Sequence, residues 1–379
     1  MKRRTLIKAM ACGAGCACLP FNPVENGLAL FQNAYALETT DTLSHVKAMY
    51  YKKLEGTAIE CELCPRHCLV TDLERGYCGV RENQGGEYYT LVHSRACAMN
   101  IDPIEKKPLF HFHPGTAAFS IATAGCNVNC KFCQNWDISQ VRPEQVTNVE
   151  LPPDEIVRIC QARSVPTVAY TYSEPIVFYE YMHDTCVEGR KFGIKNVMIT
   201  GGYIEKEPLK KIIPLMDAIK VDLKSYSQQY YEDVVNGELQ PVLDALKIIH
   251  DDGMWLELVY LVVPTMNDST KELTDLCRWV KTNLSDHVPI HFTRFHPTYL
   301  MTNLPPTPVK TLEKAYDIAR QSGLKFPYIG NVPGHSAEHT YCPGCGELLI
   351  ERLGFRINKI NLKDGMCGKC GTHIPGVWS

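Results

Sequence analysis

From about Ala117 onward, short apolar runs alternate with longer amphipathic segments along the chain. The apolar runs predict β-strands, which we place at residues 117–125, 167–175, 196–202, 218–224, 255–264 and 290–297. The segments between them have helical periodicity and predict helices at residues 152–163, 175–193, 207–217, 241–253 and 268–284. A further helix, residues 309–323, leads to residues 325–332.

Strands that alternate with helices of this length predict an α/β fold, in which parallel strands are joined by crossover helices. Six such units, with one further strand at the end, predict an open or partial (β/α)6 barrel. The first strand is not followed by G-x-G-x-x-G, which disfavours a dinucleotide-binding sheet.

Polar residues gather where the predicted strands end. They are Gly125 with the cysteines after it, Ser173–Glu174, Gly201–Gly202, Asp222–Lys224 and Arg294–His296. The C-terminal ends of the strands form the active face of a β/α barrel. The pattern therefore predicts a functional site at this rim.

Composition and charge narrow the range of partners. Of 379 residues, 45% are hydrophobic and 21% are charged, which provides enough apolar material for a core. The net charge of −3 creates no field that would attract nucleic acid or an anionic membrane. The apolar runs are too short to span a membrane.

Eleven of the eighteen cysteines fall in three groups: Cys61, Cys64, Cys68 and Cys78; Cys126, Cys130 and Cys133; and Cys342, Cys345, Cys367 and Cys370. Cysteines in C-x-x-C pairs are too close together for relaxed disulfides and are typical of metal ligation. This interpretation implies that the protein assembles in a reducing compartment.

The first and last groups each offer four thiols, which suits a closed metal site. The first group predicts a structural zinc site or a second iron–sulfur cluster, with His67 as an alternative ligand. The last group is two C-x2-C pairs separated by a 21-residue spacer, which predicts a zinc ribbon. Rubredoxin-type iron is the alternative there.

The middle group, in GCNVNCKFCQN, offers three thiols with the spacing C-x3-C-x2-C. Three thiolates on a cubane iron–sulfur cluster leave one iron with an open coordination position. An iron of this kind can bind a substrate or a cofactor and pass an electron to it. The middle group therefore favours an enzyme over a cysteine-rich binding module.

The N-terminus begins with Lys2, Arg3 and Arg4, followed by a mildly apolar stretch and Ala34-Tyr35-Ala36. This order predicts an export signal of the twin-arginine type, which carries proteins that have already folded in the cytoplasm. The alternative is a disordered basic leader on a cytosolic protein. We divide the chain into a leader (1–36), a cysteine-rich segment (37–115), a barrel (116–335) and a zinc-ribbon-like module (336–379).

The C-x3-C-x2-C motif, with Phe132 before its last cysteine and a strand before its first, resembles the signature of the radical S-adenosylmethionine (SAM) superfamily. The resemblance implies that Cys126, Cys130 and Cys133 bind a 4Fe–4S cluster whose open iron chelates SAM. It further implies reductive cleavage of SAM to a 5′-deoxyadenosyl radical, which abstracts hydrogen from a substrate. A flavodoxin or a ferredoxin is the implied electron donor.

The same resemblance implies roles for other residues at the rim. Ser173–Glu174 stands where many members have a Gly-Gly-Glu segment, so Glu174 is expected to accept the SAM ammonium group. This chain departs from the pattern with Tyr172–Ser173 in place of the glycines. Asp222 and Lys224 match an Asp-Leu-Lys segment of glycyl-radical-enzyme activases and are expected to order the SAM carboxylate. His296 matches a histidine near the adenosyl group.

CELCPRHC with GYCGVREN, the core IATAGCNVNCKFCQNW and the terminal cysteine pairs together resemble the AmmeMemoRadiSam-system radical SAM enzymes. That resemblance implies Memo-type and AMMECR-type partner proteins. Three functions follow as hypotheses. The first is a radical SAM enzyme acting on a small molecule or a protein, the second is an activase that makes a glycyl radical on a partner enzyme, and the third is an inert zinc-binding scaffold.

Overall fold

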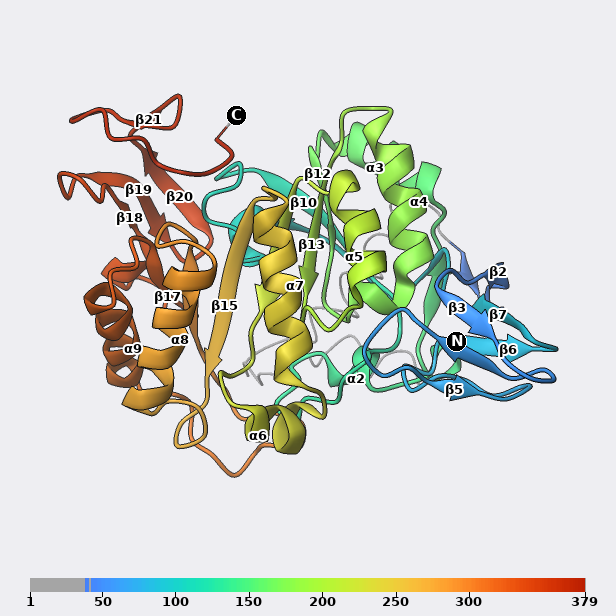
Figure 1. Cartoon of the computed structure of the whole chain (residues 1–379). Coiled ribbons are helices and arrows are strands. Elements are labelled where there is room, and N and C mark those ends of the chain that lie inside the picture. Colours follow the sequence, from blue (N-terminus) through green and yellow to red (C-terminus); the bar gives the residue numbers. More distant parts are fainter. Residues whose placement is uncertain (1–37, 41, 379) are drawn as a thin grey trace, which may run out of the picture.

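An eight-stranded sheet forms the centre of the protein in the computed structural model, which describes residues 38–40 and 42–378 (Figure 1). Its order is β17-β16-β15-β14-β13-β12-β10-β9. The strands are β9 (Ala98–Pro103), β10 (Ala117–Ala122), β12 (Thr167–Tyr170), β13 (Lys195–Thr200), β14 (Ala218–Asp222), β15 (Leu256–Val262), β16 (Ile290–Arg294) and β17 (Pro327–Gly330). The predicted leader, residues 1–36, lies outside the described residues.

Strands β10 and β12 to β17 are parallel, and each pairs with the next strand of this series. The sheet has free edges at β17 and β9, so it is an open barrel. This confirms the predicted α/β fold with parallel strands, including the strand after the last helix. The sequence did not predict β9, which pairs antiparallel with β10 and extends the sheet by one strand from the cysteine-rich segment.

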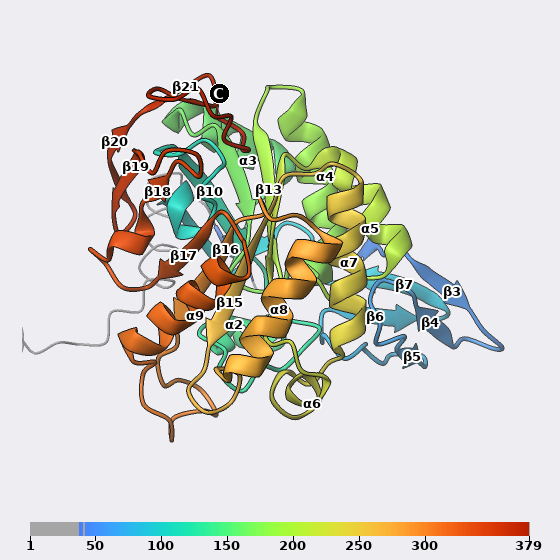
Figure 2. The same ribbon diagram turned by 60° about the vertical axis from the view of Figure 1, so that its left-hand side comes forward.

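A row of helices covers one face of the sheet (Figures 1 and 2). These are α3 (Pro153–Arg163), α4 (Tyr179–Arg190), α5 (Lys206–Ile212), α7 (Leu239–Asp251), α8 (Thr270–Asn283) and α9 (Val309–Gln321). Short helices lie in the connections: α2 (Trp136–Ser139), α6 (Gln228–Tyr230), η1 (Ile104–Lys106), η2 (Pro143–Gln145), η3 (Pro175–Phe178), η4 (Ile213–Leu215), η5 (Tyr231–Val235) and η6 (Ser336–Glu338).

Local chemistry sets the ends of these helices. At α8, the Ser269 side chain accepts a hydrogen bond from the Glu272 backbone N–H at 3.1 Å and caps the helix. The predicted helix 207–217 continues beyond α5 only as the 3-10 turn η4, which contains Pro214. Proline has no N–H to donate within a helix, so the α-helix ends before it.

The cysteine-rich segment folds into small antiparallel sheets beside the barrel. Its strands are β1 (Thr39–Thr40), β2 (Val46–Lys47), β3 (Tyr51–Lys53), β4 (Ile59–Cys61), β5 (Leu69–Val70), β6 (Arg81–Gln84), β7 (Glu87–Thr90) and β8 (Arg95–Ala96), with β11 (Asn148–Glu150) from the barrel. A buried ion pair ties this segment to α4, because Arg81 Nη2 lies 2.8 Å from Glu180 Oε1. The two side chains are 1% and 2% exposed.

The C-terminal module consists of β18 (Thr340–Tyr341), β19 (Leu348–Leu353), β20 (Arg356–Ile360), β21 (Leu362–Lys363) and β22 (Met366–Cys367). It lies at the end of the sheet opposite α2, the helix that follows the three-cysteine loop (Figures 1 and 2). His111 joins this module to the barrel by accepting from the Val377 N–H at 2.7 Å through its carbonyl oxygen. Among the described residues, no helix has the length and apolarity needed to cross a bilayer.

Candidate active site

The three-cysteine loop begins at Gly125, shortly after β10. Gly125 has a φ of 96°, which L side chains rarely adopt. A β-carbon at this position would lie 2.7 Å from Val80 Cγ1 and 2.8 Å from the Cys78 carbonyl oxygen. The turn into the loop therefore requires glycine, and the turn packs directly against the cysteine-rich segment.

Backbone hydrogen bonds fix the rest of the loop. The N–H groups of Asn129 and Lys131 donate to the carbonyl oxygens of Val235 and Val234, at 3.0 and 2.9 Å. Both acceptors lie in the π-helical turn η5. On the other side, the Lys131 carbonyl oxygen accepts from the Leu300 N–H at 3.0 Å. The loop is thus held by the connections that follow β14 and β16.

Cys130 is buried, and Cys126 and Cys133 are partly buried. Burial raises the pKa of Cys130 to about 12 and also raises the pKa values of the other two thiols. Thiols with such pKa values are protonated at neutral pH unless a metal centre binds them as thiolates. Three thiols on one short, fixed loop fit a cubane cluster that has one iron open to a further ligand.

Glu174 is buried at the end of β12, beside this loop. Its carboxylate accepts hydrogen bonds from Thr200 Oγ1 at 2.6 Å, the Gly201 N–H at 2.8 Å and the Ile176 N–H at 3.2 Å. Burial raises its pKa, and these three donors lower it. A carboxylate can accept about four hydrogen bonds, so one position remains for another donor.

The Ser173 hydroxyl donates to the Thr123 carbonyl oxygen at 2.7 Å and joins the ends of β12 and β10. It therefore contributes to the wall of the site. The Ile176 N–H that donates to Glu174 lies at the start of η3. The sequence predicted an α-helix from residue 175, but the helical segment begins with this 3-10 turn. This 3-10 turn fixes the Glu174 side chain over the rim.

Two lysines flank Asp222 at the end of β14. Lys224 Nζ lies 3.0 Å from Asp222 Oδ2, and Lys220 Nζ pairs with Oδ1 of the same carboxylate. Burial alone would raise the pKa of Asp222, but the two ammonium groups lower it to about 2. The Lys224 charge also lowers the pKa of Cys130, which places this ammonium group within electrostatic reach of the loop.

His296 is exposed just beyond β16. The segment that follows it returns to the cysteine loop through Leu300, and Tyr299 stacks on Trp136 with ring centroids 5.4 Å apart. The structure thus gathers the three cysteines, Glu174, Asp222 and Lys224 at one rim, with His296 at its margin.

The sequence did not single out Thr200 or Lys220. Thr200 ends β13 and donates to Glu174, whereas Lys220 is 4% exposed within β14. A lysine inside the apolar run AIKVD was the available signal, because a buried lysine requires a partner. No feature of the sequence around Thr200 indicated that it would contact Glu174.

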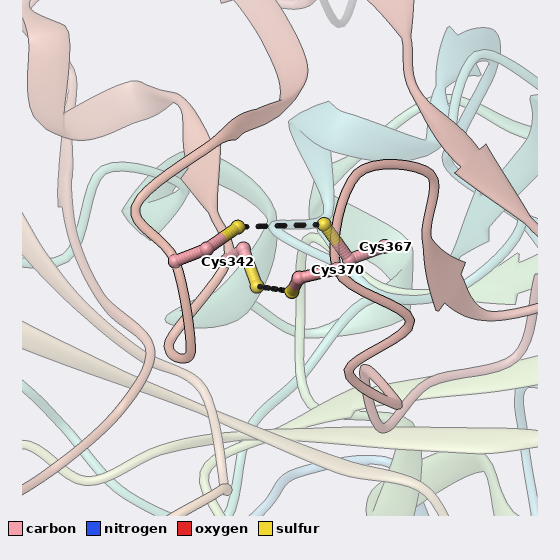
Figure 3. A group of neighbouring side chains, drawn as sticks. Cys342, Cys367 and Cys370 are labelled. Carbon is pink, nitrogen blue, oxygen red and sulfur yellow. Dashed lines mark hydrogen bonds between the residues drawn. The ribbon is translucent and has the colours of Figure 1, made fainter.

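The four C-terminal cysteines form a second candidate site, at the far end of the sheet. Cys342 and Cys370 place their sulfurs 3.6 Å apart, and the sulfurs of Cys345 and Cys367 are 3.8 Å apart (Figure 3). Four sulfurs at about 2.3 Å from a tetrahedral zinc ion would be separated by about 3.8 Å. The tetrad therefore has the geometry to hold one metal ion.

The first cysteine group lies next to the three-cysteine loop. Cys61, Cys64, Cys68 and Cys78 line one cavity, together with Asn127 from that loop. His67, the alternative ligand, is directed elsewhere: its ring nitrogens lie 3.2 Å from Glu60 Oε1 and 3.1 Å from Glu205 Oε1.

Comparison with known proteins identifies the family. Residues 120–277 match the model of the radical SAM superfamily. Uncharacterized protein MJ0808 of Methanocaldococcus jannaschii is 47% identical over 333 residues, which cover 87% of this chain and 99% of that protein. Pyruvate formate-lyase 1-activating enzyme of Escherichia coli K12 is 22% identical over 219 residues, 54% of this chain and 89% of the relative.

Among solved structures, a radical SAM methyltransferase from Sphaerobacter thermophilus is 14% identical, with a TM-score of 0.47 and coverage of 84% of both chains. Membership of the matched superfamily implies a 4Fe–4S cluster and SAM as cofactors. The family model spans the whole three-cysteine loop together with Glu174, Asp222 and Lys224. The chain belongs to the radical SAM superfamily and is an enzyme.

Proposed function

We propose that this enzyme cleaves SAM reductively at a 4Fe–4S cluster ligated by Cys126, Cys130 and Cys133. The resulting 5′-deoxyadenosyl radical abstracts hydrogen from the substrate. The observation that carries the proposal is the fixed loop of three buried or partly buried thiols at the rim where Glu174 and Lys224 also lie. The cluster, when bound, supplies the electron for this cleavage.

The residues around the loop bind and orient SAM in this proposal. Glu174 uses its remaining acceptor position for the SAM ammonium group, because its other positions are occupied by protein donors. Lys224 binds the SAM carboxylate, and Asp222 holds the Lys224 ammonium group in place at 3.0 Å. Phe132 is 3% exposed and excludes water from the loop. His296 contacts the adenosyl group.

An activase function is the second candidate. It is supported by the relatives named pyruvate formate-lyase 1-activating enzyme and by the sequence Asp222-Leu223-Lys224. In that case the substrate is a partner enzyme that receives a glycyl radical. The inert zinc-binding scaffold does not agree with membership of an enzyme superfamily.

The narrower relationship to the AmmeMemoRadiSam system, with Memo-type and AMMECR-type partners, rests on the cysteine motifs at both ends of the chain. Flavodoxin or ferredoxin is the proposed electron donor. Anaerobic pull-down with each of these proteins, using the whole chain as bait, tests both assignments. If the bait retains neither the Memo-type nor the AMMECR-type protein at micromolar concentrations, the chain does not belong to the AmmeMemoRadiSam system.

The central test is SAM cleavage by the anaerobically reconstituted enzyme with dithionite as reductant. We expect 5′-deoxyadenosine and methionine from the wild-type protein and none from Cys130→Ala. Cys277→Ala is the matched control, because Cys277 is a fully buried thiol on α8, outside the three cysteine groups. Equal cleavage by Cys130→Ala and the wild-type enzyme would refute the proposal.

Electron paramagnetic resonance separates the two candidate reactions. The enzyme is incubated with SAM, dithionite and pyruvate formate-lyase. A persistent glycyl radical on that partner supports the activase function. SAM cleavage without such a radical supports an enzyme with a different substrate.

A further inference from the structure

The first cysteine group surrounds a cavity between the cysteine-rich segment and the barrel. The cavity contains about 320 Å³ of space free of atoms, including its mouth. All four cysteines line it, together with Arg81 and Tyr88 of the small sheets. The thiols thus surround a common space on a segment fixed by the buried Arg81–Glu180 ion pair.

The spacing of these sulfurs differs from that of the C-terminal tetrad. Within residues 38–40 and 42–378, the C-terminal tetrad is the one group of three or more His, Cys, Asp or Glu ligand atoms close enough together to hold a single ion. The first group lines a wider space, although its thiols still interact electrostatically, as Cys64 does with Cys61, Cys68 and Cys78. Four thiols around a space of this kind suit a cubane cluster better than one ion.

Two polar atoms on residues that line the cavity have no partner. Arg81 Nε and the Tyr88 hydroxyl are buried and make no hydrogen bond to the protein. Arg81 is 1% exposed, and Tyr88 is fully buried. Buried donors are rarely left unsatisfied, so each of these two groups is expected to have an acceptor. The sulfurs of an iron–sulfur cluster accept such hydrogen bonds, and these bonds tune its potential.

Two further features near these cysteines are typical of a cluster-binding loop: a backbone N–H that donates to a cysteine sulfur, and a nearby arginine. The Tyr77 N–H donates to Cys68 Sγ at 3.4 Å. Arg66 stacks on the Tyr77 ring, with its guanidinium carbon 3.5 Å from the ring centroid, and donates to the Asn127 carbonyl oxygen at 2.6 Å. Arg66 therefore places positive charge beside a centre that would carry four thiolates, whereas the charge of Arg81 is balanced by Glu180.

We propose that Cys61, Cys64, Cys68 and Cys78 ligate a second four-iron four-sulfur cluster, with Arg81 and Tyr88 as hydrogen-bond donors to its sulfurs. Its four cysteine ligands leave no iron open, so this cluster does not bind SAM. It lies directly behind the three-cysteine loop, since Cys78 and Val80 contact Gly125 and Asn127 reaches the same cavity. This site does not depend on the proposed SAM chemistry.

The decisive experiment uses the full chain with Cys126→Ala, Cys130→Ala and Cys133→Ala combined, which leaves the first group unchanged. After anaerobic reconstitution, iron, acid-labile sulfide and zinc are measured, and Mössbauer spectra are recorded. We expect about four irons and about four sulfides per chain, with the spectrum of a 4Fe–4S cluster. Absence of sulfide, with two zinc ions per chain, would overturn the proposal.

The reciprocal variant, Cys64→Ser with Cys68→Ser, retains the three-cysteine loop. We expect its sulfide to fall from about eight to about four per chain. Cys277→Ser is the control and should keep about eight. Wild-type sulfide content in the folded double variant would contradict the assignment. If the double variant does not fold, the triple variant still decides the question.

Sulfide content also separates this proposal from the proposed function. An enzyme that retains a cluster in the triple variant but never cleaves SAM in its wild-type form would support the second cluster and refute the SAM chemistry. An enzyme that cleaves SAM but has no sulfide in the triple variant would support the SAM chemistry and refute the second cluster.

Discussion

The three-cysteine loop and the C-terminal tetrad lie at opposite ends of one sheet and differ in what they leave open (Figures 1 and 2). The tetrad has two sulfur pairs, 3.6 and 3.8 Å apart, and its own small strands around them. The loop has three thiols, and its neighbours are a carboxylate and a lysine at strand ends. The difference teaches that a closed ligand set stabilises a fold, whereas an incomplete one provides a site for a reactant.

Among substitutions outside the cysteine groups, the largest loss of SAM cleavage is expected from Gly125→Ala. The new β-carbon would collide with Val80 and with the Cys78 carbonyl oxygen, at a φ that alanine rarely adopts. We expect a loss of about 1–3 kcal/mol of unfolding free energy from backbone strain and a loss of cleavage greater than about 10-fold.

Gly193→Ala is the matched control for that substitution. Gly193 also has a positive φ, 72°, but a β-carbon there would meet no atom within 4 Å. Denaturant unfolding and 5′-deoxyadenosine assays on both variants separate backbone strain from collision. Equal cleavage by the two variants would contradict a special role for the Gly125 turn.

Lys224→Met is expected to have the next largest effect. It removes one of the two ammonium groups beside Asp222 and the charge that faces Cys130. We expect the KM for SAM to rise by about 10-fold, which corresponds to about 1.4 kcal/mol. Lys210→Met, at an exposed position on α5, is the control and should leave the KM unchanged. An unchanged KM in Lys224→Met would remove Lys224 from the SAM site.

His296→Ala should have a smaller effect, because this side chain is exposed at the margin of the rim. One hydrogen bond is worth about 1 kcal/mol, so we expect a rise of about five-fold in the KM for SAM with kcat little changed. The comparison variant is His250→Ala near the end of α7. A fall in kcat without a change in KM would contradict a binding role.

The smallest effect on cleavage is expected from Cys345→Ser, at the other end of the sheet. We expect the C-terminal tetrad to lose its capacity to bind a metal ion, and residues 336–378 to be cleaved faster by proteases, because a structural metal stabilises the strands around it. SAM cleavage should change by less than about three-fold. Metal analysis with zinc and iron standards also identifies the ion. A loss of cleavage as large as that of Gly125→Ala would show that the two ends are coupled.

Much of the barrel could be predicted from the sequence, because a buried parallel strand is an apolar run and each crossover helix is amphipathic. The six predicted barrel strands correspond to β10 and β12 to β16. Strand β9 was missed because AMNIDP mixes polar and apolar residues and lies at an edge. Its pairing depends on β10, which the local pattern of residues 98–103 cannot reveal.

The rim residues were suggested by their positions at strand ends, but their contacts were not. No pattern in the sequence indicates that Thr200 and Gly201, at the end of β13, donate hydrogen bonds to Glu174. Cys78 and Gly125 are 47 positions apart in the sequence, although the two residues are in contact in the fold. Such contacts depend on how the cysteine-rich segment docks onto the barrel, which periodicity does not encode.

The contact between Gly125 and Cys78 bears on how such an enzyme can be rearranged. The C-terminal module lies at the opposite end of the sheet, whereas the turn at Gly125 packs against Cys78 and Val80 (Figures 1 and 2). The cysteine-rich segment supplies β9 and the surface behind Gly125. A lineage that replaced this segment would have to rebuild the turn into the three-cysteine loop.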